Sequence, residues 1–260
     1  MCHRRKPIII CICIIIVTVG LTGCGFKSFG SEKANFRVVS INPMARIRAN
    51  HTATSLNDST VLLVGGAGGA CSVEIYTIDR DSSAGIIRDG TGCRMGHTAT
   101  VLKDNTVLIT GGVDGLEPSA TILSTSELLK MPDEIAVSTG YLTTARFNHT
   151  AIRLSDGTVL VTGGYIEDGH GRIISTRSAE VYDPGTNEFT SVQDMNVSRS
   201  GHSSTILSNG SVLVLGGTDT DGIGEIYEPW NRLFRLVDEH NIVRFDHTST
   251  LLLDGTVLNL

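Results

Sequence analysis

Aromatic residues are scarce in this 260-residue chain, where they make up 5% of the sequence, and proline occurs only 6 times. An excess of basic residues is also missing, because the formal net charge is -6. Without the three bases that precede residue 24, 18 basic residues remain against 27 acidic ones. Duplex nucleic acid and anionic membrane surfaces attract the opposite charge, so the composition argues against both as partners of the folded part.

Glycine, in contrast, is abundant, with 29 residues, or one in nine. Typical usage is about 7%. Hydrophobic residues at 40% and charged residues at 18% are ordinary for a packed chain and exclude wholesale disorder. Because no collagen-like period accompanies the glycines, they indicate many tight turns.

The N-terminus has the pattern of an export signal. A short basic segment at 1–7 precedes an apolar run at 8–20, which is too short for a comfortable transmembrane helix. Leu21-Thr22-Gly23-Cys24 resembles the bacterial lipobox. The resemblance implies a signal peptide at 1–23, acyl chains on Cys24 as the only bound group, and a polar tether at 24–34. A plain signal peptide and an uncleaved anchor are the alternatives.

This resemblance implies an exported protein that contacts the membrane of the bacterial cell envelope through its lipid. The residue after the expected lipidation site is Gly25 rather than an aspartate. That arrangement resembles the one that lets lipoproteins of diderm bacteria leave the inner membrane, so it favours the outer membrane.

The rest of the chain repeats one unit. Five histidines recur at intervals of 46, 52, 53 and 45 residues, and an arginine stands three residues before each. A Gly pair follows fourteen residues after each of the first four histidines. The repeated residues are Arg48, His51, Gly65 and Gly66; Arg94, His97, Gly111 and Gly112; Arg146, His149, Gly163 and Gly164; Arg199, His202, Gly216 and Gly217; and Arg244 and His247.

Each unit has the pattern of short β-strands. An alternating stretch after the histidine, a turn such as Asp156-Gly157, and a Val-Leu stretch predict a hairpin that ends at the Gly pair. Third strands are expected at 73–78, 127–129, 179–182 and 224–227, and two units continue into a fourth strand containing Phe189 or Phe234. Four strands in about 45–50 residues is the period of a propeller blade.

Arg-x-x-His, the Gly pair and Glu180-Val181-Tyr182-Asp183-Pro184 resemble kelch repeats of the galactose-oxidase-like propeller superfamily. The resemblance implies an all-β kelch-type propeller over residues 35–260, with units starting near 46, 92, 144, 197 and 242. Four complete four-stranded blades and a partial fifth are expected, because the fifth unit has thirteen residues after His247. The expectation is an incomplete ring in a truncated chain, and a five-bladed closure is the alternative.

The repeated polar residues are expected to be structural. The five histidines occupy the same place in their units, so they are interpreted as structural residues at the inner strands rather than as the ligands of a metal ion. Each arginine is expected to pair with a third-strand glutamate, such as Glu180 or Glu225, and the alternative is a face that meets an anionic ligand. The copper centre of galactose oxidase would need two Tyr, two His and a Tyr-linked Cys, and no such set is apparent. No catalytic or metal site is predicted.

Two further features carry hypotheses. Cys71 and Cys93 fall in loops that are expected on the same face of the propeller. An exported location favours oxidation, so a disulfide between them is a hypothesis. Two independent thiols are the alternative. The insertion at 165–179 is the most polar, and its candidate binding residues are Glu167, Asp168, His170, Arg172 and Arg177. The alternative is a merely solvated loop.

The sequence therefore predicts a lipid-anchored binding protein whose ligand is a protein or a glycan, with no catalytic activity of its own. The first alternative is a fragment of a carbohydrate enzyme that resembles galactose oxidase or the sialic-acid epimerases. A non-functional remnant is the second.

Overall fold

The computed structural model describes residues 43–67, 72–77, 82–89, 94–115, 120–130, 135–218, 223–237 and 243–260. Every described residue belongs to one compact unit, Ile41–Leu260. All the regular elements in these ranges are β-strands. No helix of the described residues is both long and apolar enough to cross a membrane.

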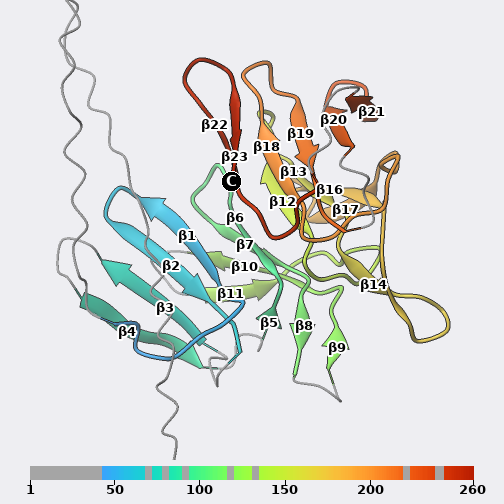
Figure 1. The fold of residues 1–260 in the computed structure, drawn as a ribbon. Helices are drawn as coiled ribbons and strands as arrows, with labels where there is room; N and C mark the ends of the chain where they lie inside the picture. The colour runs from blue at the N-terminus through green and yellow to red at the C-terminus, as the bar shows by residue number, and fades with distance from the viewer. Residues whose placement is uncertain are drawn as a thin grey trace, which may run out of the picture. The chain divides into compact units, whose positions relative to one another are not determined.

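The strands form four antiparallel sheets of four strands, here called blades one to four, and one sheet of two strands, here called the fifth unit (Figure 1). Blade one contains β1 (Thr52–Asn57), β2 (Thr60–Val64), β3 (Ser72–Thr77) and β4 (Ser82–Asp89); blade two, β6 (Thr98–Val101), β7 (Val107–Thr110), β10 (Ser126–Lys130) and β11 (Ile135–Ser138); blade three, β12 (Thr150–Arg153), β13 (Val159–Thr162), β16 (Ala179–Asp183) and β17 (Glu188–Ser191); blade four, β18 (Ser203–Ile206), β19 (Val212–Leu215), β20 (Gly224–Glu228) and β21 (Leu233–Val237); and the fifth unit, β22 (Ser249–Leu251) and β23 (Val257–Asn259). The predicted all-β class, with four four-stranded sheets and a partial fifth, is confirmed.

Turn chemistry sets the register of the first hairpin in each unit. In blade three, Gly157 takes a φ of 102°, and the Asp156 carboxylate accepts a 2.9 Å hydrogen bond from the backbone N–H of Thr158. An aspartate followed by glycine meets both requirements of such a tight turn. Val159 to Thr162 then pair in order with Arg153 to Thr150, which fixes which side chains face the neighbouring blades.

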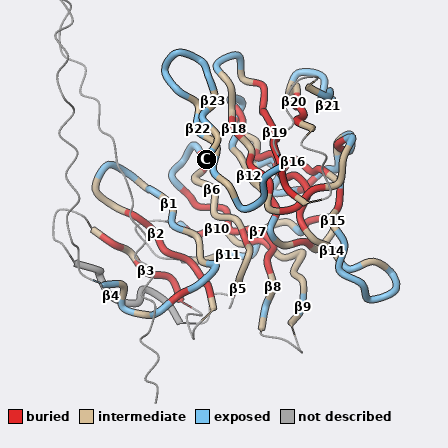
Figure 2. The backbone as a smooth tube through the Cα atoms, in the orientation of Figure 1, coloured by how far each residue is buried: buried red, intermediate tan, exposed pale blue. Residues whose placement is uncertain are grey.

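The cores lie between adjacent blades, with the second strands at their centres. All four residues of β7, β13 and β19 are buried (Figure 2). One cluster joins Leu108 of blade two to Val159, Tyr182 and Phe189 of blade three. The rings of Tyr182 and Phe189 lie 4.8 Å apart and tilted, an arrangement that aromatic pairs favour. Tyr227 and Phe234 repeat the same pair in blade four.

The Gly pairs sit where backbones approach closely. In blade three, Gly163 and Gly164 have φ values of 60° and 98°. A Cβ atom on Gly163 would lie 2.4 Å from the carbonyl oxygen of Arg199 in the next unit. Only glycine has both the backbone freedom and the lack of a side chain that this contact requires.

The segments after the Gly pairs of blades two and three, including the insertion at 165–179, contain additional strands. After the Gly pair of blade two, β8 (Val113–Asp114) pairs with β9 (Thr121–Ile122) and with β5 (Arg94–Met95). After the Gly pair of blade three, β14 (Tyr165–Glu167) and β15 (Ile173–Ser175) form a separate hairpin.

Candidate functional site

Ion pairs connect the segment before the first strand with the third strand in every complete blade. The arginine before each repeated histidine meets the glutamate of the third strand at a distance between 2.7 and 3.2 Å. The pairs are Arg48–Glu74, Arg94–Glu127, Arg146–Glu180 and Arg199–Glu225. In blades one, three and four both partners are almost completely buried, so these guanidinium groups do not meet a ligand in solvent.

The Arg146 guanidinium shows how one side chain holds a blade together. One of its terminal nitrogens donates to the carbonyl oxygens of Gly163 and Ser178, and the other donates to the Ser178 hydroxyl and the Glu180 carboxylate. Glu180 also accepts hydrogen bonds from the backbone N–H groups of Thr143 and Thr144. Burial lowers the pKa of Arg146, and the Glu180 charge opposes that shift. The pair is therefore satisfied by protein groups alone.

The repeated histidines connect one unit to the next. His97 Nε2 lies 3.0 Å from the Thr52 hydroxyl of blade one, and His149 Nε2 lies 3.0 Å from the Thr98 hydroxyl of blade two. His202 contacts the Thr150 hydroxyl of blade three in the same way. These contacts connect successive units and give the Nε2 atom of His97, His149 and His202 a hydroxyl partner.

The environment of the histidines keeps the rings neutral near pH 7. Burial is the largest cause and the charge of the nearby arginine is the next; together they lower the pKa of His97 to about 4 and that of His202 to about 3. The pKa of His149 is lowered well below its usual value for the same reasons. The edge of the His202 ring faces Gly163 rather than another histidine. Among the described residues, no group of His, Cys, Asp and Glu could hold a metal ion.

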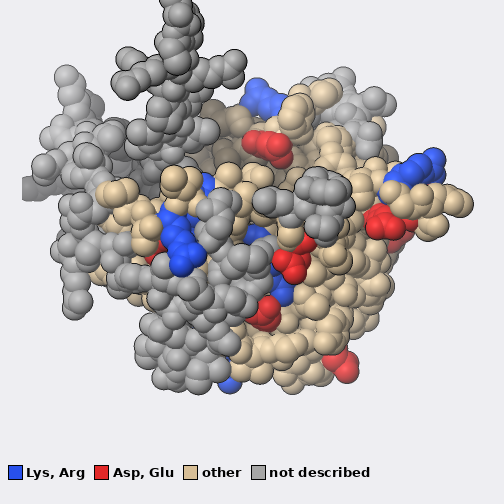
Figure 3. All heavy atoms as spheres, turned by 90° about the horizontal axis from the view of Figure 1, so that it is seen from below, with Lys and Arg blue, Asp and Glu red and all other residues tan. Residues whose placement is uncertain are grey.

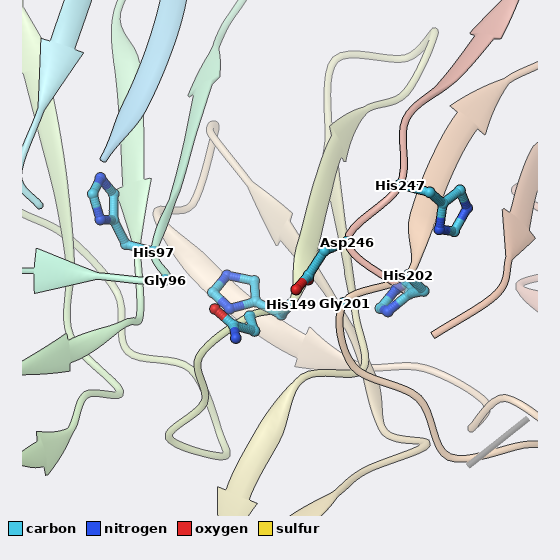
Figure 4. Close-up of a pocket in the computed structure, with 8 residues that line it drawn as sticks. Gly96, His97, His149, Gly201, His202, Asp246 and His247 are labelled. Atoms are coloured by element: carbon cyan, nitrogen blue, oxygen red, sulfur yellow. The ribbon is translucent and has the colours of Figure 1, made fainter. Parts of the chain in front are cut away.

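A hollow of about 300 Å³ lies where the inner strands of these units converge (Figure 4). Its walls are Gly96, His97, Asn148, His149, Gly201, His202, Asp246 and His247. The hollow is at the lower limit of small-molecule pockets. Its rim is occupied by hydrogen bonds within the fold: Asn148 N–H donates to Gly96, Gly201 N–H to Asn148, and Asp246 N–H to Gly201.

The residue before each repeated histidine is a feature that sequence reasoning missed. Asn50, Gly96, Asn148, Gly201 and Asp246 all have φ between 50° and 61°. Glycine, asparagine and aspartate are the residues that adopt this left-handed conformation most readily. The restricted choice of residues at this position was visible in the sequence and could have predicted this left-handed conformation, which accompanies the row of backbone hydrogen bonds from Gly96 to Asp246.

The β14–β15 hairpin contains four of the five residues predicted to bind. Glu167 ends β14, and Asp168, His170 and Arg172 form the turn before β15. The Asp168 carboxylate accepts from the backbone N–H groups of His170 and Arg172 and lies 2.6 Å from the Arg172 guanidinium. These bonds lower the pKa of Asp168 and hold the turn in shape.

Arg177 lies outside this turn. It follows β15, and its guanidinium lies 3.2 Å from the Asp194 carboxylate, an exposed contact with the segment after β17. Such surface pairs contribute between about 0 and 1 kcal/mol. The structure therefore brings together Glu167, Asp168, His170 and Arg172, and places Arg177 elsewhere.

An apolar surface next to this turn was not predicted. Ile173 and Ile174 of β15 are 52% and 41% exposed. They border a groove of about 620 Å³ that is also lined by Tyr165, Ser175, Ser198 and Thr218. Phe147 supports the hairpin base, because its backbone pairs with Tyr165 and its ring lies 5.3 Å from the tyrosine ring. Ile173, Ile174 and these other lining residues are called the hairpin groove below.

Charge does not dominate the surface. On the face shown in Figure 3, basic and acidic side chains of the described residues are interspersed rather than gathered into a patch of one sign. Cys24, Cys71 and Cys93 lie outside the described residues, as do the segments expected to be signal peptide and tether.

Comparisons with known proteins agree with the repeat. A family model described as the Kelch motif matches residues 146–196, which contain the strands of blade three. Beta-scruin of Limulus polyphemus is 37% identical over 87 residues, a match that covers 32% of this chain and 9% of scruin. The solved structure of YjhT aligns with a TM-score of 0.61 over 76% of this chain and 68% of that chain, at 12% identity.

The residues matched by the family model belong to blade three, one of the four-stranded units of the fold. Arg146, His149, the Gly pair and Glu180 all lie within the matched motif, and their contacts recur in the other blades. Residues 146–196 therefore match the Kelch motif, and the fold is of the kelch β-propeller type.

Proposed function

We propose that this chain is a lipid-anchored binding protein of the cell envelope that recognises another protein through the hairpin groove. Kelch repeats indicate a β-propeller interaction domain. Propellers keep their blade cores constant and present variable loops, and binding residues concentrate on loops held by a rigid scaffold. The role proposed for this chain is binding without catalysis.

The observation that carries the proposal is the exposure of two adjacent isoleucines on β15. Successive residues of a strand point to opposite sides, so Ile173 and Ile174 make both faces of the hairpin apolar. An isolated two-stranded hairpin is marginally stable in water. The Phe147–Tyr165 contact and the Asp168–Arg172 pair hold this one at its base and at its turn. Aliphatic side chains bordered by charged ones match the composition of a protein interface.

The ionisable groups of the blades have contacts within the fold, which favours a binding function over a catalytic one. The histidines with strongly lowered pKa values bond to hydroxyl groups of the neighbouring units, and the buried arginines bond to glutamates and backbone carbonyls. A perturbed pKa also arises in structural networks. His97, His149 and His202 line the hollow, but the Nε2 atom of each contacts a hydroxyl group of the preceding unit, which is a structural role.

The proposal predicts that a double Ile173→Ser, Ile174→Ser variant loses its partner. Burying one isoleucine contributes about 1.5–3 kcal/mol, so losing both lowers the affinity at least about tenfold. The partner is identified by photo-crosslinking from residue 174 in intact cells, and its affinity is then measured with purified proteins.

Leu236→Ser is the matched control, because Leu236 is 45% exposed on the outer strand β21 of blade four. The control is expected to bind as the unmodified chain does. An equal affinity of the double variant would contradict the proposal. Binding that disappears when glycans are removed enzymatically from the partner would assign the groove to a glycan instead.

A further inference from the structure

The turn that joins β20 to β21 in blade four, Glu228–Leu233, differs from its counterpart in blade three, Asp183–Glu188. The two turns have the same length and are flanked by the same tyrosine–phenylalanine ring pair. Their central residues have different chemistry. Trp230 stands where blade three has Gly185, Arg232 where it has Asn187, and Leu233 where it has Glu188. Residues 228–233 are called the blade-four turn below.

The blade-four turn places apolar side chains in solvent. Trp230 is 65% exposed, and Leu233 is 46% exposed. Blade three exposes the same turn, at Gly185 and Glu188, although it lies between the complete blades two and four. Exposure is therefore a property of this turn within a blade, and blade four differs by having apolar residues there.

Arg232 adopts a backbone conformation that suits other residue types. Its φ is 61°, and the other five of the six non-glycine residues with positive φ in the described ranges are Asn or Asp. In blade three, Asn187 uses this conformation, and its side-chain oxygen accepts a 3.0 Å hydrogen bond from the Tyr182 hydroxyl. Arginine has no acceptor for such a bond, and this φ is unfavourable for it. An outlier that the fold does not require points to a function.

Hydrogen bonds within the blade-four turn hold these side chains in place. The Glu228 carboxylate accepts from the Asn231 side-chain amide at 2.7 Å and from the Arg235 guanidinium at 3.1 Å. The carbonyl oxygen of Glu228 accepts from the backbone N–H of Arg232. Side chains on a preorganised turn lose less conformational freedom when they bind. The ion pairs of the described residues engage Glu228 and do not include Arg232.

We propose that the blade-four turn binds a segment of another protein that brings an apolar side chain to Trp230 and Leu233 and a carboxylate to Arg232. Tryptophan and arginine are among the residues that contribute most to protein interfaces. Contact with the exposed apolar pair supplies affinity, and charge complementarity to Arg232 supplies specificity.

This surface is separate from the hairpin groove and does not depend on it. The β14–β15 hairpin precedes the start of a third strand, β16, whereas the blade-four turn follows the end of a third strand, β20. The two surfaces therefore lie at opposite ends of the third strands.

The intrinsic fluorescence of the full chain tests the proposal, because Trp230 is the only tryptophan. The probe is a synthetic peptide, Gly-Ser-Phe-Glu-Phe-Glu-Phe-Ser-Gly, which does not emit in the tryptophan range. Its saturable binding should move the emission to shorter wavelength, since the partner displaces water from the indole ring. A matched peptide with lysine in place of both glutamates should bind at least about tenfold more weakly, because Arg232 repels it.

Variants that take the blade-three residue keep the tryptophan signal. Arg232→Asn should weaken binding of the acidic peptide at least about tenfold and should raise the denaturation midpoint, because asparagine suits this φ better. A purely structural role of Arg232 would lower the midpoint instead. Leu233→Glu should weaken binding by a similar factor. Arg177→Gln is the matched control, because Arg177 is an exposed arginine of blade three that pairs with Asp194, and its affinity should be unchanged.

Three results would overturn the proposal: no saturable emission shift, equal affinities for the two peptides, or an unchanged affinity of Arg232→Asn. A shift that appears when the chain alone is concentrated would assign the turn to a second copy. A shift with phosphatidylglycerol vesicles but not with the peptide would assign it to a lipid surface. Each of these assignments would also contradict the proposal.

Discussion

Replacing Arg146 by methionine is expected to lower the free energy of unfolding by about 3–5 kcal/mol. The substitution leaves the Glu180 carboxylate buried, at 1% exposure, without its cation. The backbone carbonyls of Gly163 and Ser178 each lose the hydrogen bond from this guanidinium at the same time. An uncompensated buried charge is far more costly than the net value of the pair, and this difference makes the effect large.

The double variant Arg146→Met, Glu180→Met separates these contributions. It removes both charges and fills the space with apolar atoms, so most of the lost stability should return. The exposed pair of Arg235 and Glu228 is the matched control: Arg235→Met should cost at most about 1 kcal/mol. Chemical denaturation followed by circular dichroism measures all three variants. If Arg146→Met costs no more than Arg235→Met, the ion pairs do not hold the blades together.

Replacing Cys24 by serine is expected to move the chain from the membrane fraction to the soluble fraction. Lipid adds about 0.8 kcal/mol per buried methylene group, and stable anchoring needs more than one chain. The proposed modification supplies several chains on a single sulfur atom. Serine cannot form the thioether, so this contribution is lost entirely. Radiolabelled palmitate incorporation and membrane sedimentation measure the two consequences.

Cys71→Ser is the control for this experiment, because Cys71 is remote in sequence from the proposed lipidation site at Cys24. It should retain both the label and the membrane association. An unmodified chain that sediments with membranes without incorporating palmitate, and whose N-terminal residues remain in the purified protein, would show an uncleaved anchor instead.

The regular part of the fold could be predicted because each unit repeats its own local chemistry. The alternation after the histidine, the Asp-Gly turn and the Val-Leu stretch specify one hairpin, as β12 and β13 show. The third strands at Glu180 and Glu225 followed from the same repetition. Five copies in one chain made this pattern distinguishable from chance.

The irregular part could not be predicted, because it depends on contacts between segments distant in sequence. The β14–β15 hairpin is held by Phe147, eighteen residues before Tyr165, and no period in the insertion indicates it. The charged residues of its turn drew attention, while the exposed surface is formed by Ile173 and Ile174. Apolar residues in a strand ordinarily predict burial, so only the structure shows that both are accessible.

Hydrogen–deuterium exchange of the full chain tests the central claim most directly, namely that one four-stranded module recurs through the described residues and that β22 and β23 form a sheet of two strands. Buried, fully paired strands open only through large-scale unfolding, whereas exposed edges exchange quickly. The amides of Val159–Thr162 and Val212–Leu215 should therefore be strongly protected, and those of Val257–Asn259 should exchange much faster. Equal protection of all three segments would contradict the account.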